Sequence, residues 1–176
     1  KLYRHTTTLL TMATKQKPSF NSHNPVTGDA IGTYPIFNEG EIADVVGRAR
    51  IATAKWQKIG FTHRKQVLLA WSSIIMKRIE QIAELISCET GKPMSDARLE
   101  VSIAVNHIEW AARHAESIMR TSFRRPGLLM ANMAATVERS PFGVIGVIGP
   151  WNYPIFTPVG SISYALAAGN TVLFKP

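Results

Sequence analysis

Residues 141–176 read PFGVIGVIGPWNYPIFTPVGSISYALAAGNTVLFKP, and this stretch decides the fold class. Residues 143–148 are a short apolar run flanked by proline and glycine, a pattern typical of a strand covered on both faces in a parallel sheet. The sequence then predicts a helix around residues 159–168, which a Gly-Asn pair ends, and a second buried strand over residues 171–174. Strand, helix and strand in this order form one βαβ unit, so we expect an α/β protein.

Upstream of this unit the sequence predicts short strands, then helices, then extended structure. Residues 18–37 alternate with turn signals and indicate short strands joined by a tight turn. Residues 122–142 are first basic and broken by Pro and Gly and then apolar, which indicates extended structure, with a hairpin as one form of it. Apolar residues at helical spacing predict three helices in between: from Glu39 to a closing Gly60, from an N-cap at Thr62 to a C-cap at Gly91, and from an N-cap at Ser95.

The composition excludes several classes of protein. The chain has 20 basic and 12 acidic residues and a net charge of +8, but no acid precedes Asp29 and bases and acids interleave elsewhere. No basic stripe with interleaved aromatic residues is present, so we expect no nucleic-acid partner. No apolar stretch reaches the roughly 18 residues of a membrane span, so we expect no membrane partner. The single cysteine, Cys88, can form no intramolecular disulfide, which suits a reducing compartment such as the cytoplasm.

The first residues differ in composition from the rest. Met12 opens a plausible native start, and residues 1–17 are expected to be a leader or a disordered tail. The alternative is an organelle transit peptide, because the stretch is basic, rich in hydroxyl groups and free of acids. It has one arginine and no clear amphipathic helix, so the leader is favoured, and with it a cytoplasmic rather than a mitochondrial location.

The loop after the first predicted strand of the βαβ unit is the candidate ligand site. In open α/β sheets ligands bind where a parallel strand gives way to its helix, and here that loop is GPWNYP, residues 149–154. The glycines do not follow the GxGxxG dinucleotide fingerprint. Spacing alone therefore indicates only a ligand loop of an unusual type.

Four ordered segments of the chain resemble the aldehyde dehydrogenase family. Residues 141–154 are similar to the family's first cofactor strand and its PWN loop, and residues 167–176 to its A-x-G-N-x-x-x-x-K-P segment. NPVTG near the start and ETGKP at residues 89–93 match two further segments. The resemblance covers about residues 20–176. It implies an α/β fold of N-terminal helices plus the first βαβ unit of a Rossmann-like cofactor domain, truncated.

The resemblance also implies a reaction, the oxidation of an aldehyde to a carboxylic acid with NAD or NADP as hydride acceptor. In the family a cysteine thiolate attacks the aldehyde, the oxyanion expels hydride to the nicotinamide, and water activated by a glutamate hydrolyses the thioester. The carboxamide of Asn152 would donate to the oxyanion. Cofactor contacts are implied for Lys175 at the adenosine ribose, for Trp151 and Pro150 beside the nicotinamide, and for the backbone of Ile148 and Gly149.

By the same resemblance the chain divides into parts of one enzyme. Residues 18–121 would be the N-terminal part of the cofactor-binding domain, residues 122–142 an arm that pairs with a neighbouring subunit, and residues 143–176 the first βαβ unit. The catalytic cysteine, the glutamate and the catalytic domain lie beyond Pro176 in the family. The chain alone is therefore expected to be inactive, and the whole enzyme to be a homo-oligomer.

Two other interpretations remain open. One is a natural short protein that binds nucleotide or a partner without catalysis, and the other is an acyl-group reductase that runs the chemistry in reverse. Cys88 is expected to be a small core residue, because the family's nucleophile lies in the later half of the enzyme. His107 and His114 share a helix face but have no set of cysteine or carboxylate ligands between them, so no metal site is expected.

Overall fold

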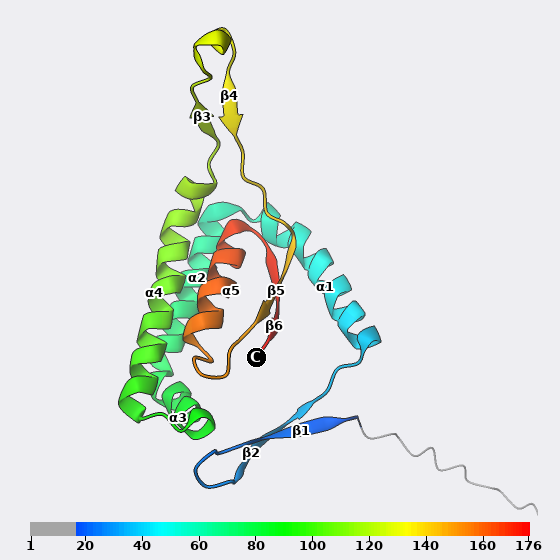
Figure 1. Ribbon diagram of the computed structural model, residues 1–176, viewed down its shortest axis with the longest axis vertical. Coiled ribbons are helices and arrows are strands. Elements are labelled where there is room, and N and C mark those ends of the chain that lie inside the picture. The colour runs from blue at the N-terminus through cyan, green and yellow to red at the C-terminus, as the bar shows by residue number, and fades with distance from the viewer. Residues whose placement is uncertain (1–16) are drawn as a thin grey trace, which may run out of the picture.

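The computed structural model describes residues 17–176 and has an α/β fold built around a layer of helices (Figure 1). The leader predicted at residues 1–17 lies outside the described residues apart from Lys17. The elements are β1 (Ser19–His23), β2 (Ala30–Pro35), α1 (Glu39–Lys58), α2 (Gly60–Lys77), α3 (Ile79–Thr90), α4 (Met94–Met119), β3 (Ser122–Arg124), the 3-10 helix η1 (Leu128–Met130), β4 (Ala135–Val137), β5 (Val144–Ile148), α5 (Phe156–Ala168) and β6 (Thr171–Lys175).

Strands β5 and β6 and helix α5 form the predicted βαβ unit. The two strands pair in parallel, from Val144 opposite Thr171 to Ile148 opposite Lys175. Helix α5 lies on one side of the strands and α1 on the other, and both helices contact both strands (Figure 1). The prediction of an α/β fold with this unit is therefore confirmed.

Helix α5 begins earlier than the sequence predicts. It starts at Phe156 rather than around Val159, and it holds Pro158 in its first turn. A proline is compatible with that turn, because the first N–H groups of a helix have no partner within it. The end of the helix is as predicted, since Gly169 takes a left-handed φ of 102° and stops it.

The second predicted helix is two helices. Arg78 leaves the helical region, at φ −109° and ψ 17°, and so separates α2 from α3. The turn at this residue lets both helices pack against α4. Arginine is a good helix former and the apolar spacing continues past it, so periodicity did not reveal the break.

The N-caps predicted at Thr62 and Ser95, for the helices that are now α2 and α4, are wrong. Helix α2 already begins at Gly60, so Thr62 lies within its first turn, and no side chain caps this helix. Helix α4 begins at Met94, and the hydroxyl of Ser95 donates to the carboxylate of Asp96 at 3.2 Å instead of capping. Both residues are of the type that favours caps, but the neighbouring backbone was already helical.

The core lies between α2, α3, α4 and α5, with α4 at its centre. Small side chains on α4 let the other helices approach closely. Helical spacing in the sequence predicts that Val67 and Ile74 lie on the apolar face of α2, but Leu68 is buried there while Val67 and Ile74 are about half exposed. Helical spacing also predicts one apolar stripe on α4, and this is confirmed because its members are buried: Val101, Ala104, Val105, Ile108 and Ala111.

Arg64 of α2 joins the helix layer to the βαβ unit. Its buried guanidinium donates to the carbonyls of Ala167 at 3.2 Å and Gln57 at 3.2 Å, near the ends of α5 and α1. Carbonyls at helix C-termini lack partners and carry partial negative charge, so a cation satisfies both needs. Burial lowers the pKa of Arg64 from its usual value, but a guanidinium remains charged in proteins.

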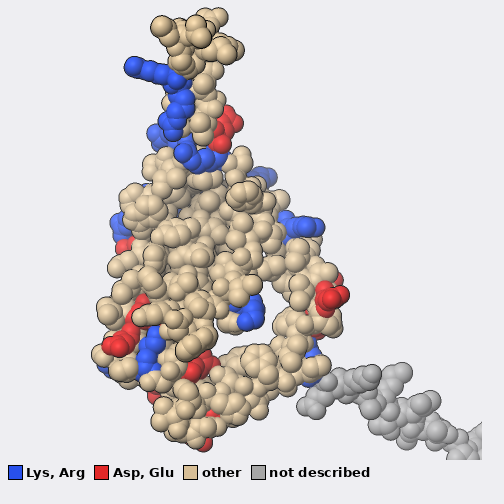
Figure 2. Space-filling model, viewed as in Figure 1, with Lys and Arg blue, Asp and Glu red and all other residues tan. Residues whose placement is uncertain are grey.

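Residues 122–142 contain an antiparallel hairpin of β3 and β4, with η1 at its tip. The hairpin projects from the rest of the molecule (Figure 1). Leu128 and Leu129 at the tip are 93% and 98% exposed. Figure 2 shows an uncharged tip above a stem that carries basic side chains. The predicted extended structure is therefore confirmed, and it takes the hairpin form.

Candidate functional site

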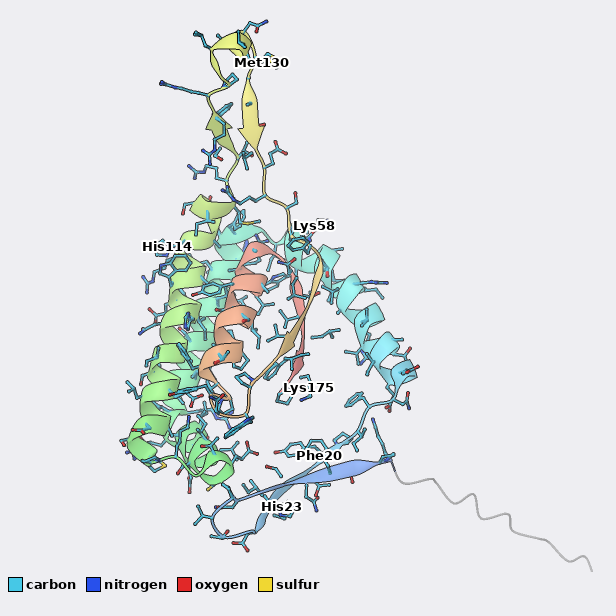
Figure 3. The ribbon with its side chains drawn as sticks, viewed as in Figure 1. Phe20, His23, Lys58, His114, Met130 and Lys175 are labelled. Atoms are coloured by element: carbon cyan, nitrogen blue, oxygen red, sulfur yellow. The ribbon has the colours of Figure 1, made fainter. Side chains whose placement is uncertain are left out.

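The candidate site lies at the carboxyl edge of the β5–β6 sheet. The last pair in the parallel register is Ile148 opposite Lys175, and the N–H of Gly149 donates to the Lys175 carbonyl at 2.8 Å. The chain then leaves the sheet into residues 149–155, which lead to α5. Figure 3 shows Lys175 at the free end of β6. Three of the predicted cofactor residues are thus brought together in space.

The loop presents its side chains to solvent. Trp151 is 82% exposed and Ile148 78%, Asn152 and Lys175 are exposed, and Pro150 is half-buried. Within the described part of the chain the carboxamide of Asn152 has no hydrogen-bond partner. The Lys175 ammonium donates to the carbonyl of the adjacent Pro176 at 3.2 Å. An amide, a cation and an indole at an open sheet edge are able to receive a ligand from solvent.

The ring of Phe174 leaves no room for a side chain at residue 149. A Cβ at this position would come within 3.1 Å of Cε2 of Phe174 and 3.5 Å of Cγ of Pro158. The first of these distances is shorter than the optimal contact between carbon atoms of about 3.5–4.0 Å. Glycine therefore lets strand and loop pack together and leaves the backbone of the first loop residue uncovered.

A buried charge pair that the sequence did not reveal holds the other end of the loop. Glu100 of α4 is 2% exposed, and its Oε1 accepts the N–H groups of Ile155 at 2.9 Å and Phe156 at 3.1 Å. Its Oε2 accepts from Nζ of Lys92 at 2.5 Å. Helix α5 has no side-chain cap from its own N-cap residue, so Glu100 caps it from a neighbouring helix.

Lys92 extends this support to Asn152. Its Nζ also donates to the backbone carbonyl of Asn152 at 2.9 Å and lies 4.3 Å from the ring centre of Tyr153. One signal could have identified the pair: Glu100 lies four residues before Ala104, which places it one turn away on the same face of the helix. A carboxylate on such a face is buried only with partners, and a base was available in the ETGKP segment.

Asn170, from the Gly-Asn pair that ends α5, has a structural role. Its Oδ1 accepts the N–H of Gly143 at 2.8 Å, and its Nδ2 donates to the carbonyl of Ala165 at 3.1 Å. Next to it the hydroxyls of Thr53 and Thr171 share a hydrogen bond of 2.7 Å, which connects α1 with β6. These contacts set the sheet against its two helices and so position the carboxyl edge.

Cys88 is half-buried near the end of α3. The base four residues further along is Lys92, whose ammonium is already bound to Glu100 and to the Asn152 carbonyl. Cys88 is partly buried and not one of the buried core residues, which differs from the expectation of a small core residue.

The two histidines of α4 have aromatic partners. Nδ1 of His107 lies 2.7 Å from the hydroxyl of Tyr164, and His114 stacks on Trp110 with the ring centres 4.7 Å apart. Over residues 17–176 no three His, Cys, Asp or Glu side chains gather in a way that could hold a metal ion. Over the same residues no helix has the length and apolar character needed to cross a bilayer.

A parallel β5–β6 pair with an open loop at its carboxyl edge defines the chain as an α/β protein of the kind that binds ligands at that edge. The model of the aldehyde dehydrogenase family matches residues 11–176, which is nearly the whole chain. The chain therefore belongs to the aldehyde dehydrogenase family.

Individual relatives agree with this assignment. The chain is 31% identical over 161 residues to a probable succinate-semialdehyde dehydrogenase (NADP(+)) of Sinorhizobium fredii, covering 92% of this chain and 32% of that protein. It is 37% identical over 155 residues to an N-succinylglutamate 5-semialdehyde dehydrogenase of Novosphingobium aromaticivorans, covering 88% and 32%. The chain thus spans about a third of the length of these curated relatives.

A solved structure matches the fold as well. The NADP-dependent glyceraldehyde-3-phosphate dehydrogenase from Bacillus halodurans, in complex with NADP, superposes with a TM-score of 0.82 at 32% identity. The match covers 93% of this chain and 34% of that one. The fold of the present chain thus corresponds to about a third of that larger enzyme.

Proposed function

We propose that this chain acts as part of an enzyme that oxidises an aldehyde to a carboxylic acid with NAD or NADP as hydride acceptor. The observation that carries the proposal is the open carboxyl edge of β5 and β6, with Asn152 on the loop and Lys175 at the strand end. Membership of the aldehyde dehydrogenase family supports the reaction class. The semialdehyde dehydrogenases among the relatives suggest small aldehydes that carry a carboxylate as the first substrates to test.

The residues at this edge fit a nicotinamide dinucleotide. The cofactor supplies hydride acceptance when it is bound, and the chain supplies binding and orientation. Lys175 is exposed at the strand end and is assigned to the hydroxyls of the adenosine ribose. The backbone of Ile148 and Gly149 is assigned to close contacts with the cofactor, and Pro150 and Trp151 to the wall of the cleft beside the nicotinamide.

Asn152 is assigned as the donor to the oxyanion that develops when the aldehyde carbonyl is attacked. Its carboxamide is exposed and unbonded within the described residues, while its backbone is held by Lys92. One such donor contributes about 2.7–4 kcal/mol to the transition state, because it meets negative charge that the ground state lacks. The attacking cysteine and the general-base glutamate would come from other residues of the whole enzyme, so residues 1–176 alone are proposed to be inactive.

The domain assignment follows from the same proposal. Residues 18–121 and 143–176 belong to the cofactor-binding domain, and the hairpin within residues 122–142 is an arm that meets a neighbouring subunit of a homo-oligomer. The exposed leucines at its tip support this, since apolar side chains on a projecting hairpin gain by burial. A cytoplasmic location is proposed for the enzyme, supported by the single cysteine of the chain.

The test is turnover by the whole enzyme that carries this chain. Aliphatic, aromatic and semialdehyde substrates are assayed with NAD and with NADP by the absorbance of the reduced nicotinamide, and the carboxylic acid is identified as product. A folded enzyme with its cysteine intact that oxidises none of them contradicts the proposal. Reduction of activated acyl groups without aldehyde oxidation would favour the acyl-group reductase instead.

A further inference from the structure

We infer that Lys92 and Glu100 are positioning residues for aldehyde oxidation, because they fix the backbone on both sides of the Asn152–Phe156 turn and thereby aim the Asn152 amide. The inference rests on the proposed function, in which that amide meets the oxyanion. Neither residue touches the reacting atoms, so both act through Asn152.

Lys92 and Glu100 bind backbone atoms at the two ends of the turn. The carbonyl of Asn152 accepts from Lys92 at 2.9 Å, and the N–H groups of Ile155 and Phe156 donate to Glu100 at 2.9 and 3.1 Å. Hydrogen bonds to charged groups are the stronger kind, and here they fix both ends of one short turn. Pro154 adds a restricted φ between these fixed points.

The Asn152 side chain takes its orientation from its own backbone. Because its carboxamide has no partner among the described residues, no bond of its own sets its direction. The direction therefore depends on the backbone from which the side chain leaves, and Lys92 binds that backbone at the carbonyl of the same residue. An oxyanion donor is effective only within a narrow range of positions, so a loose backbone lowers the rate of the chemical step.

The Lys92–Glu100 pair does more than link two helices. A surface pair, Arg98 and Glu80 at 2.8 Å, already connects α4 with α3. Glu100, by contrast, is buried, and its side-chain hydrogen bonds go to Lys92 and to the start of α5. Burying a carboxylate costs free energy unless hydrogen bonds or an opposite charge compensate it. For Glu100 these compensating partners lie on the loop or bind to it.

The experiment uses the whole enzyme with Lys92→Met, a neutral chain of similar length, and measures kcat and cofactor Kd separately. We expect kcat to fall about tenfold while cofactor Kd changes less than about twofold, because the loss is confined to the transition state. Lys92→Arg retains a donor for both acceptors and should restore most of kcat. Arg98→Met is the matched control, since it breaks the surface pair of the same helices and should leave kcat and cofactor Kd unchanged.

Two outcomes separate positioning from general stability. In an Asn152→Ala background, Lys92→Met should cost less than about twofold in kcat, because residues that act as a unit are not additive. A full further tenfold loss there, or an unchanged kcat in the single variant, would overturn the inference.

A second measurement is independent of activity. Amide hydrogen exchange of residues 152–156 should become about tenfold faster in Lys92→Met and stay unchanged in Arg98→Met, because the variant removes a local support. If the parent enzyme oxidises no aldehyde, the proposed function fails. Exchange then still decides whether the pair holds the loop, and unchanged exchange in Lys92→Met rejects that role. Glu100→Gln tests the same point from the other partner if Lys92→Met does not fold.

Discussion

The side chain of Asn170 accepts the backbone N–H of Gly143 at 2.8 Å, although 27 residues separate the two in sequence. Through this bond the turn that ends α5 is joined to the residue that precedes β5. The same carboxamide donates to Ala165, so both of its ends are used. The asparagine of the Gly-Asn pair thus fixes the backbone that supports the candidate site.

Replacing Asn170 by Ala is expected to destabilise the enzyme by about 1–3 kcal/mol, because it leaves the part-buried N–H of Gly143 without its acceptor and removes one of the donors to the Ala165 carbonyl. The measurement is the midpoint of urea unfolding for parent and variant. Asn106→Ala, on the exposed face of α4, is the control and should leave the midpoint unchanged. A midpoint for Asn170→Ala equal to that of the control would refute the structural role.

Arg64→Met is expected to lower stability by about 1–3 kcal/mol, since the carbonyls of Ala167 and Gln57 lose the hydrogen bonds from the buried guanidinium. The stability of Arg64→Lys should lie between that of the parent enzyme and that of Arg64→Met, because one ammonium group cannot reproduce the several fixed N–H donors of a guanidinium. Thermal unfolding measures both, with Arg48→Met on the exposed side of α1 as control. Equal melting temperatures for Arg64→Met and Arg48→Met would show that the buried cation is dispensable.

Asn152→Ala is expected to lower kcat by about 10²–10³-fold with a smaller change in cofactor affinity, the size found when one oxyanion donor is lost. Asn152→Asp should be as slow, because it keeps the shape and removes the N–H donor. Steady-state kinetics with a saturating aldehyde provide kcat, and calorimetry provides the cofactor Kd. A variant as fast as the parent would reject the assignment of the oxyanion donor.

Lys175→Ala is expected to raise the cofactor Kd roughly tenfold, since a charge-assisted hydrogen bond is worth about 1.5 kcal/mol at the lower end. The position at the carboxyl end of β6, opposite Ile148, motivates this. Calorimetry with NAD and with NADP measures it, and Lys77→Ala at the end of α2 controls for the loss of one surface charge. Unchanged affinity for both cofactors would mean that Lys175 is only a surface charge.

Residues 1–176 expressed alone are expected to be poorly soluble and not to bind cofactor. The β5–β6 sheet has two strands, so each strand presents an unpaired edge, and Ile148 and Phe174 on these strands are exposed. Helical circular dichroism would persist, so the test is size-exclusion chromatography together with a thermal melt in the presence of NAD. A monodisperse fragment whose cooperative melt NAD shifts upward would instead favour a natural short binding protein.

Much of the fold could be predicted because its signals are local. Short apolar runs, a Gly-Asn stop and helical spacing identified the βαβ unit and the helix layer. The break at Arg78 could not be predicted in this way, since both helices continue one apolar pattern and the turn serves their packing on α4. The predictions of N-caps at Thr62 and Ser95 were wrong, because residue type indicates where a helix is able to start. It does not indicate where packing against neighbouring segments makes the helix start.

The candidate site was predicted in part. Family segments pointed to residues on the loop and at the end of β6, and the parallel register brings Ile148, Gly149 and Lys175 together. The contacts of Lys92 and Glu100 with the loop were not predicted, because the loop partners lie 60 and 55 residues away and are backbone atoms. Every residue other than proline has the same backbone carbonyl and N–H, so the sequence does not mark which of them accepts from Lys92 or donates to Glu100.

The capping of α5 by Glu100 has a consequence for the order in which the chain folds. The carboxylate that caps the first turn of α5 belongs to Glu100 of α4. The loop before α5 therefore takes its final shape only after the two helices have docked. Lys92 and Glu100 leave the ribosome before residues 152–156, and N-terminal segments are available to fold first during synthesis. The helix layer can therefore serve as the template on which the later loop closes.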